Sequence, residues 1–481
     1  MSLSRRKFLG QASCAAIGST TALSTLVNLF SVNTAAARPA KVNNDYKALV
    51  CILLAGGHDS FNMLMPRDAT RWNQYNATRS GLAIPRVGGT NNSHPPMLAI
   101  NPTNAGSGKQ YGVHPSFSGI KNLFENGQAA FLSNVGTLAV PIANRTQYRS
   151  SSYKKPLGLF SHSDQIQQWQ TSVPRDRQAV GWGGRMADVM HDLHNNANIS
   201  MNISLSGKNV FQAGNTMSEY SIKSTGNGAV GLEAIPWRSN AGFLTNIRDN
   251  AVESMIAKDY ANLLQSSLSD LTQNSIDAQE QFSNAIGALP PLNTTFSDHY
   301  LSQNMRMAAK TIAAHDGLGM NRQTFFMTFG GWDHHDEVIN NQLYMYDVLS
   351  RAISEFYTAL QEIGMENDVT TFTISDFGRT LTSNGNGSDH AWGGNQLVVG
   401  GAVKGKKIYG SFPDLGLDYN ANPLNVNQRG SLIPTTSVDE YFAELALWFG
   451  VPSTQLANVL PNIGNFYSGS GMPIGFMDMN A

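Results

Sequence analysis

Cysteine is nearly absent from this chain. Only Cys14 and Cys51 occur among its 481 residues, and Cys14 lies in an N-terminal segment that we expect to be removed. A mature chain with one cysteine forms no intrachain disulfide, even in a compartment where disulfides persist. We therefore expect its stability to come from burial of an apolar core and from bound ions.

Charge is also scarce. Charged residues make up 14% of the chain and the formal net charge is −1, so the composition lacks the basic footprint of a nucleic-acid-binding protein. No Gly-x-Gly-x-x-Gly motif follows the first apolar run, where Gly56-Gly57 leads into His58-Asp59 instead. A carboxylate in that turn does not cradle a phosphate, which argues against a nucleotide-binding oxidoreductase.

Long apolar runs are missing too, because no stretch reaches the 18 or more residues of a membrane span. The N-terminus nevertheless has a secretory layout: Arg5-Arg6, then Phe8-Leu9, a weakly apolar run to about Phe30, and the small residues Ala35–Ala37. This pattern predicts a twin-arginine signal peptide over residues 1–37, with an ordinary N-terminal membrane anchor as the alternative. Residues 38–481 are then expected in the periplasm or outside the cell. The twin-arginine export machinery delivers them, and no stable membrane span remains.

The rest of the chain alternates between patterns typical of strands and of helices. Continuous apolar runs predict buried strands over residues 47–54, 129–135, 324–329, 369–374 and 396–400. Apolar residues at helical spacing predict helices over residues 114–127, 338–364 and 437–449, the last with a Ser437/Glu440 capping box. Residues 67–113 and 199–235 are expected as excursions, the second with short strands, and residues of about 240–319 as a helical segment. This alternation predicts one α/β domain with a mostly parallel central sheet.

Three of the predicted strands end in polar loops that carry residues suited to catalysis or metal binding. These loops are Gly56–Asn62, Gly330–Asp336 and Ser375–Thr380, the last followed by Ser388-Asp389-His390. Because ligands of open parallel sheets bind outside the carboxyl ends of the strands, we expect the three loops to be neighbours in space. Five of the eleven histidines lie in these loops or in the Ser161-His162 loop: His58, His162, His334, His335 and His390.

The carboxylates of these loops favour a bound cation. Asp59, Asp333 and Asp376 would share one cleft, and Arg379 is the local basic residue that the sequence offers. Three ionised carboxylates need more counter-charge than one arginine supplies. Mixed carboxylate and imidazole donors suit zinc, manganese or iron. The alternative is that each aspartate caps a turn or helix after its glycine pair.

The motifs together resemble an exported family known as domain of unknown function 1501, and the resemblance spans nearly the whole mature chain. The residues that carry it are Gly56-Gly57-His58-Asp59, Phe160-Ser161-His162, Gly330-Gly331-Trp332-Asp333, Ser375–Thr380, Asp389-His390, Leu432–Thr436 and Trp448–Val451. That family is similar to the alkaline phosphatase and sulfatase superfamily. The resemblance implies a three-layer α/β/α sandwich with a site for one or two divalent metal ions, zinc or manganese, at the strand ends.

By position, the resemblance implies Asp59, Asp333, His335, Asp376 and His390 as metal ligands. Phe377 stands where the superfamily has a histidine, which puts one of two metal sites in question. Ser161 at a helix start is the candidate nucleophile and Ser60 its rival, while Arg379 would hold an anion and His162 or His334 would move a proton. No Cys-x-Pro-x-Arg signature occurs, which excludes a formylglycine sulfatase.

The resulting hypothesis is an exported metal-dependent hydrolase of phosphate or sulfate esters. Its substrate would be a small-molecule or glycan anionic ester. The alternative is a non-catalytic structural or binding protein of the envelope that keeps the fold.

Overall fold

The central sheet is built around the first predicted strand. A computed structural model describes residues 46–88, 94–191, 196, 198–228, 254–255, 258 and 262–481, so the predicted signal peptide and part of the 240–319 segment lie outside the described residues. Strand β1 (Lys47–Ala55) pairs in parallel with β8 (Arg322–Gly330) on one side and with β9 (Val369–Ser375) on the other. Its side chains are buried on both faces, as its unbroken apolar run predicts.

Within the described residues the sheet has nine strands, in the order β11-β5-β10-β9-β1-β8-β6-β7, with β12 beside β5. The remaining strands are β5 (Ala129–Gly136), β6 (Asn202–Ser204), β7 (Tyr220–Ser221), β10 (Gly394–Val399), β11 (Lys407–Gly410) and β12 (Thr436–Ser437). Strand β10 runs antiparallel to both β5 and β9, and all other pairs are parallel. The predicted mostly parallel sheet is confirmed.

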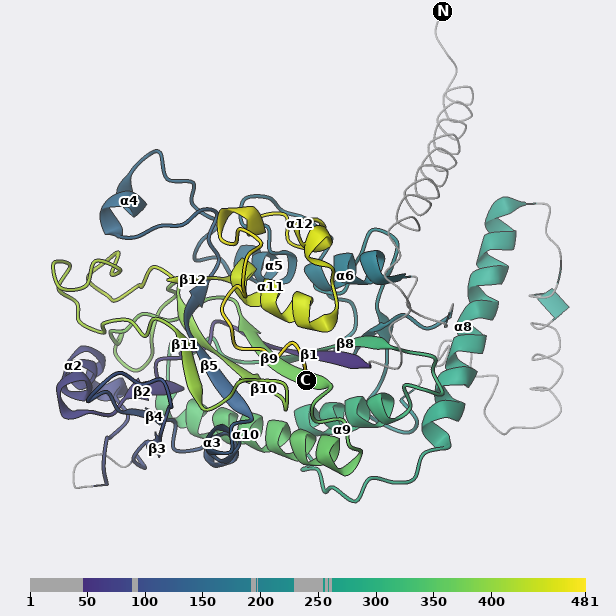
Figure 1. Ribbon diagram of the computed structural model, residues 1–481, viewed down its shortest axis with the longest axis horizontal. Helices are drawn as coiled ribbons and strands as arrows, with labels where there is room; N and C mark the ends of the chain where they lie inside the picture. The colour runs from purple at the N-terminus through teal and green to yellow at the C-terminus, as the bar shows by residue number, and fades with distance from the viewer. Residues whose placement is uncertain are drawn as a thin grey trace, which may run out of the picture. The chain divides into compact units, whose positions relative to one another are not determined.

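Helices cover both faces of this sheet (Figure 1). One face carries α3 (Ser118–Glu125), α9 (Tyr300–Ala313) and α10 (Val338–Glu362); the other carries α5 (His162–Thr171), α6 (Trp182–Met190), α11 (Val438–Phe449) and α12 (Leu456–Val459). The architecture is therefore the predicted α/β/α sandwich. The long helix α8 (Leu263–Gly287) buries Ala278, Phe282 and Ile286.

The two segments predicted to leave the sheet, residues 67–113 and 199–235, contain more regular structure in their described parts than the sequence indicated. Residues 64–113 contain a separate antiparallel sheet, in the order β2-β4-β3, and helix α2. Their bounds are β2 (Leu64–Pro66), α2 (Ala69–Arg79), β3 (Leu98–Ile100) and β4 (Tyr111–Val113). The strands β6 and β7 of the second excursion extend the central sheet instead of leaving it. Short helix α4 (Arg145–Arg149) lies between β5 and α5.

Helix α11 begins with the predicted capping box, since the Ser437 hydroxyl accepts the Asp439 N–H and the Glu440 side chain accepts the Ser437 N–H. Next to this cap, burial raises the pKa of Asp439 to about 6, although Asn462, Ser172 and Ser437 donate hydrogen bonds to it. Among the described residues, no helix is both long and apolar enough to cross a membrane.

The Asp439 carboxyl makes stability depend on pH. Between the ordinary pKa of 3.8 and about 6, the folded state keeps a proton that the unfolded state has lost. The free energy of unfolding therefore falls as pH rises through this window, by about 3 kcal/mol. We expect Asp439→Asn to remove this slope. Denaturant unfolding of both proteins at pH 4 and pH 7 measures it, and parallel pH profiles would contradict the assignment.

Candidate metal centre

The parallel register brings the three polar loops to one edge of the sheet. Ala55 at the end of β1 pairs with Gly330 of β8, and Leu54 pairs with Ser375 of β9. The chain leaving each strand therefore enters the same region, as the sequence predicted. Helix α5 starts at this edge with His162, and the loop after β9 returns with Asp389 and His390 before β10.

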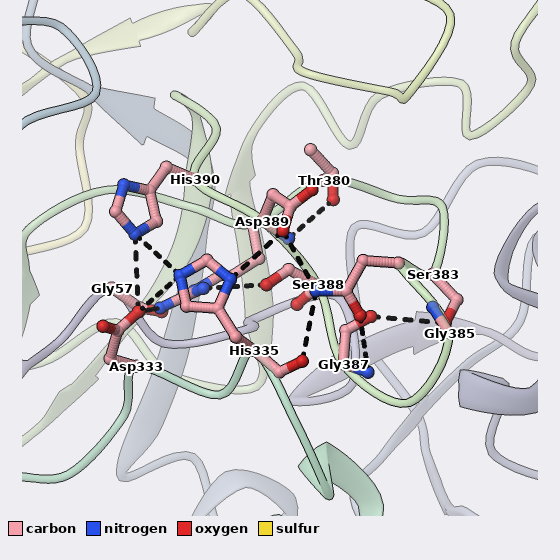
Figure 2. A network of polar contacts seen from close by, with 12 residues as sticks. Gly57, Asp333, His335, Thr380, Ser383, Gly385, Gly387, Ser388, Asp389 and His390 are labelled. Carbon is pink, nitrogen blue, oxygen red and sulfur yellow. Dashed lines mark hydrogen bonds and ion pairs between the residues drawn. The ribbon is translucent and has the colours of Figure 1, made fainter.

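Three imidazole rings and one carboxylate meet here. The Nε2 atom of His390 lies 3.1 Å from Nε2 of His162 and 3.1 Å from Nε2 of His335. The Asp333 carboxylate lies 3.4 Å from Nε2 of His162, 3.2 Å from Nε2 of His335 and 3.4 Å from Nε2 of His390. Figure 2 shows His335, His390 and Asp333 pointing toward one another. We call these four residues the His3Asp cluster.

The opposite nitrogen of each ring has its own acceptor. Nδ1 of His162 lies 2.6 Å from the Asp376 carboxylate, and Nδ1 of His335 lies 3.1 Å from the Asp389 carboxylate. Nδ1 of His390 lies 2.8 Å from the Phe160 carbonyl oxygen, which can only accept. Because a carbonyl oxygen only accepts, Nδ1 of His390 carries a proton. The carboxylates beside Nδ1 of His162 and His335 favour the same tautomer, in which Nε2 presents its lone pair.

The cluster thus directs three nitrogen lone pairs and a carboxylate at one another. A proton on one Nε2 would make a hydrogen bond to only one neighbouring nitrogen and an ion pair with Asp333, whereas a metal ion can bind all of these lone pairs at once. Single ligating atoms of His162, Asp333 and His390 lie within 4.8 Å of one another, and His335 contacts two of these three residues. Histidine ligands of metals commonly donate their other N–H to a carboxylate or a carbonyl. The donors fit zinc and related ions.

The surroundings of Asp333, Asp376 and Asp389 shift the pKa of each carboxyl group. Burial alone would raise the pKa of Asp333, but the Arg379 guanidinium beside it holds the pKa below its usual value. Burial raises the pKa of Asp376, against the hydrogen bonds from His162 and the Gly56 N–H. The pKa of Asp389 is lowered because Asn384, His335 and Arg429 together outweigh its burial.

Asp59 and Asp376, two further predicted ligands, lie outside the group of ligating atoms within 4.8 Å of one another. Asp59 is fully buried and lies 2.6 Å from the Arg79 guanidinium, with the Ser388 hydroxyl donating to the same oxygen at 3.0 Å. Asp376 receives the Gly56 N–H on one oxygen and the His162 ring on the other. Two arginines, Arg79 and Arg379, therefore compensate the negative charge of the three predicted carboxylates. The prediction of a cation from the charge of Asp59, Asp333 and Asp376 counted only Arg379, and it was incomplete because Arg79 also pairs with Asp59.

Arg379 is not free to bind a substrate anion as predicted. Its side chain is fully buried. The guanidinium donates to the carbonyl oxygens of Gly56, Gly57 and Ser388, and it also contacts the Asp333 carboxylate. Arg379 therefore orients Asp333 and ties the first loop to the third.

The remaining predicted catalytic side chains, and the loop histidine His58, lie in different surroundings. Ser161 is the residue before α5, at the predicted helix start, and its hydroxyl lies 3.1 Å from that of Ser163. Ser60 is fully buried and accepts the Asn395 N–H, so this rival nucleophile faces the core. His58 and His334 flank Trp332 in the interior, and burial lowers the pKa of His334 to about 4.

Asp376 in this arrangement orients the His162 ring of the candidate metal centre. We expect Asp376→Asn to weaken zinc binding about 10–100-fold, the usual effect of losing a partner behind a ligand. A chelator-competition titration with zinc measures this change. An asparagine variant that binds no zinc at all would instead indicate that Asp376 is a direct ligand.

Comparison with solved structures finds distant likenesses. The chain is similar to Ps i-CgsB in complex with k-i-k-neocarrahexaose, at 10% identity over 87% of this chain and 77% of that chain, with a TM-score of 0.34. It is also similar to a mutant of alkaline phosphatase PafA, at 14% identity over 70% of this chain and 63% of that one, with a TM-score of 0.25. Likenesses this distant carry no argument about chemistry.

No curated protein sequence matches the chain. A family model does, and it covers most of the described residues and all four members of the His3Asp cluster. Because residues 46–435 match the family described as "Protein of unknown function (DUF1501)", the chain belongs to that family.

Proposed function

We propose that this protein is a metal-dependent hydrolase of phosphate or sulfate esters. The observation that carries the proposal is the convergence of three imidazole lone pairs and the Asp333 carboxylate. Such a set of donors is costly to assemble without a cation, and imidazole and carboxylate groups are common ligands of catalytic zinc. The side chains are also accessible, since the Asp333 side chain is 46% exposed.

In this proposal His162, Asp333 and His390 would hold one divalent ion, which leaves a coordination position for an ester oxygen. His335 contacts Asp333 and His390 beside them. The ion, when bound, supplies Lewis-acid catalysis at an ester oxygen. Zinc is the first candidate because imidazole predominates among the donors, and manganese is the second. Asp376, Asp389 and the Phe160 carbonyl keep the three rings in the tautomer that can bind it.

Two further features support an anionic substrate. Within the part of the chain that the structure describes, no side chain caps the start of α5 beside His162, and the positive end of a helix favours an anion. Arg429 contacts the Asp389 carboxylate and its side chain is 44% exposed, which leaves part of its guanidinium facing solvent. Arg429, rather than the buried Arg379, is therefore our candidate for binding phosphate or sulfate oxygens.

We expect Arg429→Gln to weaken anion binding about 10- to 150-fold, because a bond to a charged group contributes roughly 1.5–3 kcal/mol. Calorimetric titration of the zinc-loaded protein with inorganic phosphate measures the effect. Zinc affinity, measured in parallel, should change much less. Equal losses of phosphate and zinc binding would show that Arg429 acts only through Asp389 and His335.

The proposed activity is tested by assaying the protein, stripped of metal and then reloaded with zinc or manganese, against aryl phosphate and aryl sulfate esters. We expect hydrolysis that disappears in the stripped protein and in the Asp333→Asn variant. A protein that binds the metal yet hydrolyses neither ester would favour the alternative, a binding protein of the envelope that keeps the fold.

We also propose that the chain acts outside the cytoplasm after twin-arginine export. The support is the sequence of residues 1–37, with Arg5-Arg6 and the small residues Ala35–Ala37. N-terminal sequencing of protein recovered from the periplasm or the medium should begin at Arg38. An N-terminus at Met1 in membranes would indicate an uncleaved anchor.

A further inference from the structure

Asp59 is the predicted ligand that the structure separates most clearly from the His3Asp cluster. Its carboxylate and the Arg79 side chain are both fully buried, and Nη2 of Arg79 lies 2.6 Å from Oδ2 of Asp59. Nη1 of the same arginine lies 3.3 Å and 3.4 Å from the carbonyl oxygens of Thr380 and Leu381. Arg79 is the last residue of helix α2. Its guanidinium therefore contacts the loop that follows β9, far away in the sequence.

Arg79 places a permanent positive charge at the Oδ2 atom of Asp59, while the Oδ1 atom is buried without a hydrogen-bond partner among the described residues. A guanidinium stays protonated at every physiological pH and matches a carboxylate geometrically. Since Arg79 already compensates the charge of Asp59 in the core, a divalent ion at Oδ2 would have to displace a buried arginine. Asp333 differs, because its side chain is 46% exposed and faces three imidazole rings in addition to Arg379. Leaving that arginine without its partner in the core is strongly unfavourable.

Asp376 and Phe377, which follow β9, also offer no unengaged ligand atom to a second ion. Both oxygens of Asp376 are engaged, by the Gly56 N–H at 3.0 Å and by the His162 ring at 2.6 Å. The Phe377 ring is buried, with its centroid 4.9 Å from that of His162 and 4.5 Å from that of His390. A phenyl ring offers no lone pair to a metal. Within the described residues, the one group of three or more potential metal ligands is that of His162, Asp333 and His390.

We infer that the centre takes a single metal ion at the His3Asp cluster, and that Arg79 is a permanent cation of the protein in the place of a second ion. This inference rests on the proposed metal-dependent function and specifies its metal content. It also implies that Asp59 is a structural partner of Arg79 rather than a metal ligand.

The experiment counts zinc ions per chain. Full-length mature protein is stripped with a chelator, loaded with excess zinc, passed through gel filtration, and analysed for zinc and protein. The same count is made for Asp333→Asn, and for the double variant Asp59→Asn/Arg79→Met, which removes both charges of the buried pair together. Far-UV circular dichroism checks that each variant is folded.

We expect one zinc ion per chain in the wild type, none in Asp333→Asn, and one in the double variant. Two ions in the wild type would overturn the single-ion inference while leaving a metal-dependent hydrolase possible. Zero ions would overturn both proposals. If the double variant does not fold, the wild-type count together with Asp333→Asn still decides between one ion and two.

Discussion

Replacing His390 by alanine is expected to weaken zinc binding more than 100-fold. The Nε2 atom of His390 contacts both other rings of the cluster and lies 3.4 Å from the Asp333 carboxylate, so its loss removes the donor shared by all the others. Losing only the partner behind a ligand costs about 10–100-fold in affinity, and losing the ligand itself should exceed that range.

The measurement is the shift in thermal unfolding on adding zinc. A ligand that binds the native state at 100 times its Kd stabilises it by about 2.7 kcal/mol, which the wild type should gain and His390→Ala should lose. His315→Ala is a matched control, because His315 packs on Tyr46 and contacts the Met320 carbonyl next to the first residues of β1 and β8, at the opposite end of these strands. Full zinc-dependent stabilisation of His390→Ala would contradict the proposed ligand set.

Replacing Arg79 by methionine is expected to destabilise the fold by about 3–5 kcal/mol, the usual consequence of leaving a buried charge without its partner. Asp59 is fully buried, and after the substitution only the Ser388 hydroxyl would still donate to its Oδ2 atom. The Thr380 and Leu381 carbonyl oxygens would lose a donor too.

Urea unfolding followed by circular dichroism measures this loss. The double variant Asp59→Asn/Arg79→Met should recover much of the stability, since replacing both members of a buried ion pair often costs little. Additive losses in the two single variants and the double variant would show that the two side chains do not depend on each other. A loss below about 1 kcal/mol in Arg79→Met would contradict the buried-pair description.

The fold was predictable from local patterns because strands buried on both faces and amphipathic helices have strong periodic signals. The run Lys47–Leu54 became the central strand β1, and Ser437 with Glu440 formed the expected cap of α11. The 64–113 segment was harder, since its three-residue strands are too short to show periodicity.

The candidate site was predictable in its location and only partly in its detail. Asp333, His335 and His390 follow strands or precede them directly, so topology alone brings them together. No local pattern indicates that Arg79, at the end of α2, reaches Asp59, or that a main-chain carbonyl at Phe160 orients His390. Asp389 was detectable, because it directly precedes His390 in the sequence.

The central claim is that imidazole nitrogens from separate loops bind one metal ion together with Asp333. X-ray absorption spectroscopy of the zinc-loaded protein tests it most directly, because imidazole rings give a distinctive outer-shell scattering pattern. We expect nitrogen and oxygen neighbours at about 2.0–2.1 Å from the zinc ion, with at least two imidazole rings. A spectrum of zinc bound by oxygen alone, without imidazole scattering, would contradict it.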